Sequence, residues 1–296
     1  MRKSILIFVN PVSGKRNGLS LAKALSDEAN NAGIDSLILE SSINNEVNFQ
    51  MLRSINLASY FAMVAIGGDG LVHYAVQVLA GKTLPIYVVP AGTGNDFARS
   101  NRTLLFDSKY IVKQIIERSP QQIDVGNIIF GSEQRKFVQI LSTGFDANVN
   151  DRANRNRFIS GKLKYTLATL LELPKFRAVD YEIEYDGVKR CLPAMLIAIA
   201  NGRTYGGGMQ LCPMAVRDDG LFDVMILHPV SKFELLKVFP KVFSGSHVNH
   251  PAVEFVTARK VQISANTVAY ADGERVGKLP ITVEVLPKSL QTWIAY

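Results

Sequence analysis

Apolar runs that end abruptly in glycine-rich turns are the feature that most restricts the fold of this chain. The clearest is Ile66-Gly67-Gly68-Asp69-Gly70, where an apolar run meets three glycines and one carboxylate just before a helical pattern. Glycines allow positive φ angles and let a phosphate approach main-chain amides, and the following helix presents the positive end of its dipole. The turn therefore predicts a phosphate site, although a tight turn with a capping Asp69 explains these few residues equally well.

Two more turns of this kind follow apolar runs. Ile86–Val89 leads into Pro90-Ala91-Gly92-Thr93-Gly94-Asn95-Asp96-Phe97-Ala98-Arg99, and Ile5–Val9 leads into Asn10-Pro11-Val12-Ser13-Gly14-Lys15. In an open parallel sheet, ligands bind beyond the carboxyl ends of the strands, so the three turns are expected to meet at one crevice. A carboxylate there repels phosphate unless a divalent cation lies between them. Asp69 is therefore predicted to bind magnesium or to orient a nucleotide.

The pattern of the chain changes near residue 120. Before it, buried strands alternate with helical segments, which predicts a doubly wound, mostly parallel α/β sheet. After it, short strand-like runs such as Arg190–Ala200 predict an antiparallel β-sandwich, with Asp186-Gly187 as a hairpin turn and helices at Lys162–Leu173 and Lys232–Val242. We expect a nucleotide-binding domain over residues 1–121 and a β-rich domain over 122–296, whose final residues can return to the first domain.

Composition and apolar run lengths predict a cytoplasmic protein. The chain has 296 residues with 47% apolar side chains, enough to bury the cores of two domains. No apolar run reaches the roughly 18 to 20 residues of a membrane span, and Ile5–Val9 is shorter than the hydrophobic region of about 7 to 15 residues in a signal peptide. Cys191 and Cys212 have no metal-type spacing, so reduced thiols are expected.

A net charge of +7 and a pI near 9.3 predict attraction to polyanions. Nucleic acid is not expected as a partner, because no basic run with interleaved aromatics or known nucleic-acid module is present. An anionic membrane surface is the other candidate, where each basic residue contributes about 1 kcal/mol. A solvated basic face explains the same residues equally well. The basic cluster that could meet a membrane consists of Arg152, Arg155, Arg157, Lys162 and Lys164.

Together the three turns resemble the catalytic domain of the bacterial diacylglycerol kinases, lipid kinases related to sphingosine and ceramide kinases. Gly67–Gly70 alone would also suit NAD kinases or phosphofructokinases, which share this architecture, whereas Pro90–Arg99 resembles the lipid-kinase branch alone. The resemblance implies transfer of the γ-phosphate of ATP to a lipid hydroxyl, most simply diacylglycerol giving phosphatidate, with ATP and Mg²⁺ as cofactors. The alternatives are an NAD kinase-like enzyme and a catalytically silent nucleotide or lipid sensor.

The resemblance also assigns roles to single residues. Glu274, in Asp272-Gly273-Glu274, matches the carboxylate that takes the proton from the lipid hydroxyl, an effect of about 10²–10⁴ in rate. Asp272 is assigned to catalysis beside it, either orienting Glu274 or a metal, and forming the turn explains it equally well. The nucleotide-binding residues implied are Asn10, Pro11, Val12, Ser13, Gly14, Ser41, Gly67, Gly68, Asp69, Gly70, Thr93, Gly94, Asn95 and Asp96. Ser42 is the alternative to Ser41, and Asp69 is also assigned to catalysis.

Two further expectations come from the resemblance. A structural magnesium is implied on the Asp219 carboxylate and the carbonyls of Val216 and Leu221, an oxygen-only shell that suits a hard cation, although an exposed turn also explains these residues. Leu71 stands where the family usually has Thr, which removes a phosphate-directed donor worth about 1–3 kcal/mol and predicts weakened or lost activity. The implied enzyme associates peripherally with a membrane during turnover, and a homodimer is the assembly expected if it oligomerises.

Overall fold

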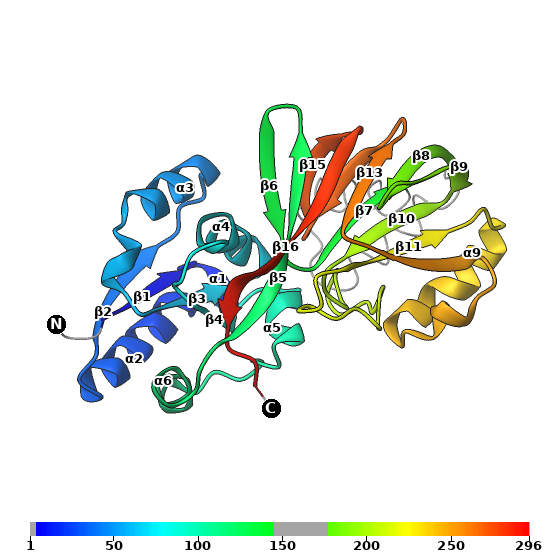
Figure 1. Cartoon of the computed structure of the whole chain (residues 1–296). Helices are drawn as coiled ribbons and strands as arrows, with labels where there is room; N and C mark the ends of the chain where they lie inside the picture. The colour runs from blue at the N-terminus through cyan, green and yellow to red at the C-terminus, as the bar shows by residue number, and fades with distance from the viewer. Residues whose placement is uncertain (1–3, 145–176, 296) are drawn as a thin grey trace. The chain divides into compact units, whose positions relative to one another are not determined.

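The computed structural model describes residues 4–144 and 177–295 (Figure 1). The chain divides into two compact units, which we call the first unit (Met1–Ile123 with Lys288–Tyr296) and the second unit (Asp124–Pro287). The first unit is an α/β layer structure and the second is built from antiparallel strands, which confirms the predicted fold class. No described helix is long and apolar enough to cross a membrane.

The first unit is built on parallel strands in the order β2-β1-β3-β4. The two central strands, β1 and β3, are almost wholly buried, as expected for parallel strands covered on both faces. The edge strand β2 is only partly covered. The bounds are β1 Ser4–Val9, β2 Asp35–Glu40, β3 Ala62–Gly67 and β4 Ile86–Pro90.

Helices cover both faces of this sheet. Figure 1 shows α2 and α6 on one side and α3 and α4 on the other. Side-chain caps fix where two of them begin, because Asn44 accepts the amide of Glu46 (2.9 Å) and Asp107 accepts that of Tyr110 (3.1 Å). The bounds are α1 Ser13–Arg16, α2 Gly18–Asn31, α3 Asn45–Ser54, η1 Leu57–Ser59, α4 Asp69–Leu79, α5 Asp96–Ser100 and α6 Ser108–Glu117.

The end of the chain packs into the first unit. The last residue of β16 (Ile281–Thr292) pairs in parallel with Ile86 of β4. The amide group of Asn101 donates to the Thr292 hydroxyl (2.9 Å), and both side chains are fully buried. The indole of Trp293 donates to the carbonyl of Arg118 (2.9 Å) and is itself buried. These contacts anchor the chain terminus beside β4 and α6.

The second unit is a sandwich of two antiparallel sheets. One contains β16-β13-β8-β9 with the β5–β6 hairpin, and the other has the order β12-β11-β10-β7-β14-β15. Apolar side chains of both sheets, among them Ile183, Ile199 and Val261, form one buried cluster between them. The remaining bounds are β5 Gln121–Phe130, β6 Glu133–Phe137, β7 Ile140–Gly144, β8 Val179–Tyr185, β9 Val188–Ala194, β10 Leu196–Ala200, β11 Phe222–Leu227, α9 Lys232–Val238, η3 Phe239–Phe243, η4 Ser246–Asn249, β12 Val253–Ala258, β13 Lys260–Ser264, β14 Val268–Ala271 and β15 Glu274–Lys278.

Two predicted elements of this unit are divided in the structure. The run Arg190–Ala200 is interrupted at Met195, and its halves, β9 and β10, belong to different sheets. The helix predicted over Lys232–Val242 is α-helical only to Val238, because Pro240 lacks the amide that would continue it and the chain goes on as a 3₁₀ helix. The Asp186-Gly187 hairpin is confirmed, with φ of 46° and 89°. The predicted helix Lys162–Leu173 and the basic cluster lie outside the described residues.

Candidate active site

The three glycine-rich turns meet at the carboxyl edge of the first unit's sheet. The amide of Asn10 donates to the carbonyl of Ile66 (3.0 Å), and that of Ala91 donates to the carbonyl of Gly67 (2.9 Å). The amide of Gly14 donates to the carbonyl of Ala91 (2.6 Å), which ties the first turn to the third. Backbone hydrogen bonds therefore hold the three turns together.

Glycine is required where the second and third turns cross. A Cβ atom on Gly92 would lie 2.4 Å from the Cα of Gly68, closer than two nonbonded carbon atoms can approach. One turn would have to move away from the other to make room for a side chain. The glycines here thus serve the packing of two backbones, in addition to any approach by a phosphate.

Asp69 links the same two turns through its side chain. It is the first residue of α4, and its Oδ1 accepts the amides of Asp96 (2.8 Å) and Phe97 (3.4 Å) at the start of α5. Burial raises the pKa of Asp69, and the amide bonds from Phe97 and Asp96 act in the opposite direction. The carboxylate therefore caps α5, a helix that begins 27 residues further along the chain.

The third turn closes on itself through Asn95. This residue has a left-handed backbone (φ 55°), its Oδ1 accepts the amide of Gly92 (2.8 Å), and its Nδ2 donates to the Gly92 carbonyl (2.8 Å). Arg99 donates from its guanidinium to the carbonyl of Gly94 (3.3 Å). Thr93 lies between Gly92 and Gly94, whose backbone groups make these hydrogen bonds, and it is exposed. The turn therefore presents Thr93 outward from a loop fixed by Asn95.

The first turn is also shaped by its own side chains. Asn10 accepts the amide of Val12 on Oδ1 (3.1 Å), and the hydroxyl of Ser13 donates to the Asn10 carbonyl (2.7 Å). The side chain of Val12 is 64% exposed. Ser41 lies at the same edge, because its amide donates to the carbonyl of Val9 (2.8 Å). The backbone from Asn10 to Ser13, with Ser41 beside it, is thus held in one defined conformation.

Leu71 points into the protein and away from the surface of the turn. Its side chain is only 5% exposed, and a Cβ atom on Gly67 would lie 2.6 Å from its Cδ2. The leucine fills space beside the strand end that a polar side chain would leave poorly packed. Leu71 is therefore a core residue in this chain.

In the second unit, Asp272 binds the backbone at the start of β7. Its Oδ2 accepts the amide of Val138 (2.8 Å), and its Oδ1 accepts those of Gln139 (2.9 Å) and Ile140 (3.2 Å). It adopts a left-handed conformation with φ of 49°. This geometry places the Asp272 carboxylate on the backbone of residues 138–140, in the turn that directly precedes β15.

Glu274 opens β15 with an accessible side chain. Partial burial raises its pKa, whereas the positive charge of Arg135 lowers it. Arg135 is held nearby, because its guanidinium donates to the carbonyl of Arg275 (2.8 Å). A carboxylate whose pKa is raised is a better proton acceptor than an ordinary glutamate, which suits the role the resemblance gives it.

The loop predicted to hold a structural magnesium is fastened to Asp124. The amide of Gly220 donates to Asp124 Oδ2 (2.7 Å), and the Asp124 amide donates to the carbonyl of Arg217 (2.6 Å). Asp219 Oδ1 accepts the amide of Leu221 (3.0 Å) within the turn. Asp124 is fully buried in β5, and sequence reasoning missed it. A single carboxylate between the apolar residues Ile123 and Val125 was the available signal.

The chemistry of this loop fits a hard cation. Burial raises the pKa of Asp223, and the negative charge of nearby Asp219 raises it further, so a cation here would offset the repulsion between the two carboxylates. The described residues contain no group of three or more His, Cys, Asp or Glu side chains that could hold a metal. A cation at this loop would therefore depend on backbone carbonyls such as those of Val216 and Leu221.

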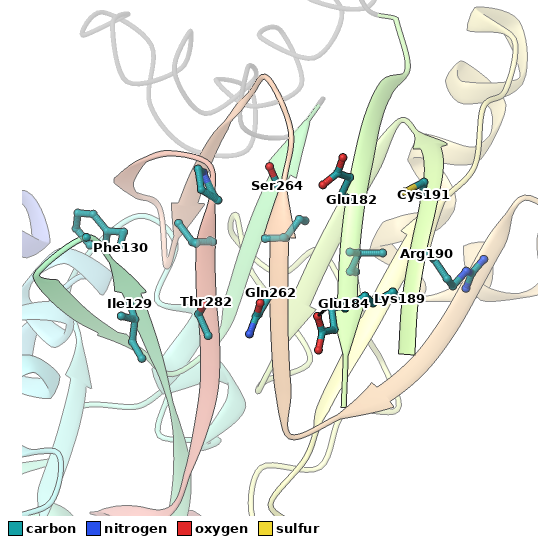
Figure 2. A pocket seen from close by; sticks show the side chains of 15 residues that line it. Ile129, Phe130, Glu182, Glu184, Lys189, Arg190, Cys191, Gln262, Ser264 and Thr282 are labelled. Atoms are coloured by element: carbon teal, nitrogen blue, oxygen red, sulfur yellow. Dashed lines mark ion pairs between the residues drawn. The ribbon is translucent and has the colours of Figure 1, made fainter. Parts of the chain in front are cut away.

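A separate groove of about 490 Å³ crosses the outer face of one sheet in the second unit (Figure 2). Its cations already have partners, because Lys189 pairs with Glu184 (3.5 Å) and Arg190 binds Glu254 with both terminal nitrogens. Gln262 stands on the same face as other polar side chains. None of the described residues that line the groove is a predicted site residue, and the lining mixes polar side chains with apolar ones such as Phe130 and Ile281.

Known families match both parts of the chain. The diacylglycerol kinase catalytic domain matches residues 4–128, and the YegS C-terminal NAD kinase beta sandwich-like domain matches residues 139–294. A diacylglycerol kinase of Mycobacterium tuberculosis is 32% identical over 290 residues, which cover 97% of this chain and 94% of the relative. The chain belongs to the diacylglycerol kinase family. It is an ATP-dependent lipid kinase, as its sequence predicts.

More distant relatives of this diacylglycerol kinase family member agree. A diacylglycerol kinase of Staphylococcus saprophyticus is 28% identical over 285 residues, covering 95% of this chain and 92% of the relative. A solved diacylglycerol kinase structure from Bacillus anthracis superposes with a TM-score of 0.74 at 17% identity, covering 99% of this chain and 97% of that one. The likeness to the solved structure extends the agreement in fold to the whole chain.

Proposed function

We propose that this lipid kinase phosphorylates diacylglycerol and releases phosphatidate and ADP. Curated relatives that match nearly the whole chain carry the name diacylglycerol kinase, which supports this acceptor. The observation that supports ATP as the phosphate donor is that three glycine-rich turns lie together at one sheet edge. The hydrogen bonds from the amides of α5 to Asp69 hold two of these turns in place. Glycine-rich turns at the carboxyl ends of parallel strands are suited to holding a polyphosphate.

In the proposed complex, main-chain amides of Gly68–Gly70 at the start of α4 bind the phosphates of ATP. The segment Asn10–Gly14, whose amides already donate within the protein, lies beside them and contacts the nucleotide through its exposed surface. Residues Thr93–Asp96, with Ser41, contact the nucleotide from the neighbouring turns. Asp69 Oδ1 accepts the amides of Asp96 and Phe97, so Oδ2 is proposed as the oxygen that meets a nucleotide-bound cation. Mg²⁺ bound with ATP would offset the charge of the phosphates beside this carboxylate.

Glu274 is proposed to accept the proton of the diacylglycerol hydroxyl. The O–H bond breaks as the proton moves to the carboxylate, the oxygen bonds to the γ-phosphorus, and the bond from that phosphorus to the ADP oxygen breaks. Such a positioned base contributes a factor of about 10²–10⁴. Asp272 acts through the backbone, because its bonds to residues 138–140 fix the turn in front of Glu274.

A second Mg²⁺ is proposed at the loop from Val216 to Leu221, with Asp219 as the side-chain ligand. The support is the set of oxygen donors and the electrostatic repulsion between Asp219 and Asp223. When bound, the ion would supply positive charge and rigidity to a loop that Asp124 already fastens. Its role is structural, since no reacting group is assigned to this loop.

The test is phosphate transfer from labelled ATP with Mg²⁺ to separate acceptors: diacylglycerol, sphingosine, undecaprenol and NAD. We expect label in diacylglycerol and a loss of about 10²–10⁴ in the Glu274→Gln variant. Glu117→Gln is the control, because Glu117 is an exposed glutamate of α6 in the first unit. Label that appears mainly in sphingosine or undecaprenol would reject diacylglycerol as the acceptor, and unchanged turnover in Glu274→Gln would reject the assigned base.

We also propose that the enzyme meets anionic membranes peripherally through α9. Phe233 and Leu236 on this helix are 80% and 39% exposed, beside the exposed Lys237. Burying a phenylalanine contributes about 1.5–3 kcal/mol, and each surface lysine about 1 kcal/mol. Phe233→Ser is expected to reduce co-sedimentation with phosphatidylglycerol vesicles, whereas Leu105→Ser, at an exposed leucine of the first unit, is expected to leave it unchanged. A homodimer stays a prediction.

A further inference from the structure

The first unit contains a pocket of about 830 Å³ that none of the assigned roles uses. Its walls come from the last turn of α3, residues 55–61 around η1, the last turns of α4 and residues 82–84. The volume falls within the range of about 300–1,000 Å³ that small-molecule sites occupy. We call it the α3–α4 pocket.

The α3–α4 pocket lies at the opposite edge of the sheet from the glycine-rich turns. Phe61 and Leu84 line it. Phe61 directly precedes β3, and Leu84 is separated from the start of β4 by one residue. The turns follow the other ends of the same strands. A strand of six residues, such as β3, spans about 20 Å. An occupant of the pocket therefore does not overlap a nucleotide at the turns.

The lining of this pocket combines apolar walls with unpaired positive charge. Its apolar side chains include Leu52, Val78 and Leu84, and no aspartate or glutamate is among the described residues that line it. Lys82 and Arg53 form no ion pair with any described carboxylate, and the Arg53 guanidinium lies over the ring of Phe49 (5.8 Å). The groove of Figure 2 differs in this respect, because its cations are bound to glutamates. The α3–α4 pocket has free capacity for an anion.

We propose that the α3–α4 pocket binds an amphipathic anion with a single alkyl or acyl chain and a carboxylate or phosphate-monoester head. The chain would lie against the apolar walls, where it is removed from water. The head would meet Arg53 and Lys82, with the Tyr60 hydroxyl as a further donor that has no partner among the described residues. Charge-assisted bonds of this kind are stronger than neutral ones.

Both cations also lie where they can stabilise helix carboxyl ends, and the test must distinguish this role from ligand binding. Arg53 lies in the last turn of α3, and the amide of Lys82 donates to the carbonyl of Leu79 at the end of α4 (2.8 Å). Cations at these places offset the partial negative charge of helix carboxyl ends. Helix capping alone predicts that their removal lowers stability without changing ligand affinity. A binding site predicts that affinity falls.

The experiment is calorimetric titration of the full chain, without ATP, with dodecyl phosphate and dodecanoate below their critical micelle concentrations. Two partial probes are titrated separately. Dodecanol supplies the alkyl chain without the anionic head, and inorganic phosphate supplies the head without the alkyl chain. We expect at least one dodecyl anion to bind, and both partial probes to bind weaker by about tenfold or more. The proposal is overturned if neither anion binds, or if either partial probe binds as tightly as the anions.

Variants locate the site. Arg53→Glu and Lys82→Glu are each expected to weaken anion binding by about tenfold, whereas Lys23→Glu, at an exposed lysine of α2 outside the pocket, leaves it unchanged. Ala58→Trp keeps both charges but narrows the pocket, so it is also expected to weaken binding. Unchanged affinity in Lys82→Glu, or displacement of the probe by a non-hydrolysable ATP analogue, would overturn the assignment. None of these readouts depends on phosphate transfer, so they stand apart from the proposed acceptor.

Discussion

The carboxylate of Asp69 accepts the backbone amide of Asp96 at 2.8 Å, so the acidic residue of the second turn caps the helix that follows the third. A single side chain thus couples two turns, through residues that lie 27 positions apart in the sequence. Burial makes the ionised form of Asp69 costly, and the amides of α5 are its compensation. Changes at Asp69 should therefore affect stability and nucleotide binding through different properties of the side chain.

Two substitutions of Asp69 separate these effects. Asp69→Ala leaves the amides of α5 without an acceptor and is expected to lower the free energy of unfolding by about 1–3 kcal/mol. Asp69→Asn keeps the Oδ1 acceptor and removes the buried charge, so it should destabilise less. Both variants should lose phosphate transfer if the charge engages a nucleotide-bound cation. Urea denaturation and ATP turnover are the measurements, and equal destabilisation by the two variants would contradict the capping role.

Asp186 occupies a turn of similar geometry to that of Asp272 and serves as its control. Asp186 also precedes a glycine, has φ of 46°, and accepts the amides of Arg259 and Lys260. Asparagine tolerates the left-handed conformation, so Asp272→Asn and Asp186→Asn both keep the backbone and lose a charged acceptor. We expect each to lower the free energy of unfolding by about 1–3 kcal/mol.

Only the first of these variants should impair catalysis. Asp272 fixes the turn before Glu274, whereas Asp186 fixes a hairpin between β8 and β9. Turnover under conditions where both variants are folded should fall in Asp272→Asn and stay near the wild-type value in Asp186→Asn. Equal turnover in the two variants would show that Asp272 contributes stability alone.

Leu71 can be tested with two substitutions of nearly equal shape. Leu71→Val shortens a buried side chain, and Leu71→Thr does the same while burying a hydroxyl. The hydroxyl is expected to make the threonine variant less stable than the valine variant by about 1–3 kcal/mol. Because the Leu71 side chain lies beside Gly67 in the interior, threonine should bring no gain in ATP affinity. Thermal unfolding and ATP titration check both points, and tighter ATP binding by Leu71→Thr would restore the phosphate-donor interpretation.

The sequence patterns that predicted most of this fold are local. Apolar runs such as Ile86–Val89, followed by glycine-rich turns, indicated the strands of the first unit, because buried parallel strands need continuous apolar residues and a tight exit. The Asp186-Gly187 turn indicated a hairpin by the same kind of local chemistry. The break at Met195 was not visible, because β9 and β10 pair with different sheets and only long-range contacts decide that.

The parts of the candidate site that escaped sequence reasoning are long-range hydrogen bonds. Asp69 with α5, Asp272 with residues 138–140, and Asp124 with Gly220 each join segments far apart in the chain. A sequence shows the carboxylate but not the amides that surround it. Leu71 likewise invited comparison with a phosphate-facing threonine, and only the burial of its side chain reveals a packing role.

Glu274 predicts a particular dependence of activity on pH. As the proton acceptor it must be ionised, and burial raises its pKa, so the acid limb of kcat/KM should lie above the value of about 4.3 for an ordinary glutamate. Arg135→Gln removes the positive charge that favours the carboxylate, and the limb should therefore move to still higher pH. Arg259→Gln, at an exposed arginine of the same unit, is the control and should leave the limb in place.

The direction of this shift distinguishes electrostatics from a change in fold. If Arg135 mattered only through its hydrogen bond to the carbonyl of Arg275, its loss would lower activity at every pH and leave the position of the limb unchanged. If its charge stabilises ionised Glu274, activity at high pH should survive while activity at low pH falls first, because more of the variant carries the proton there. A limb that moves to lower pH in Arg135→Gln would contradict the assignment of Glu274 as the base that this charge tunes.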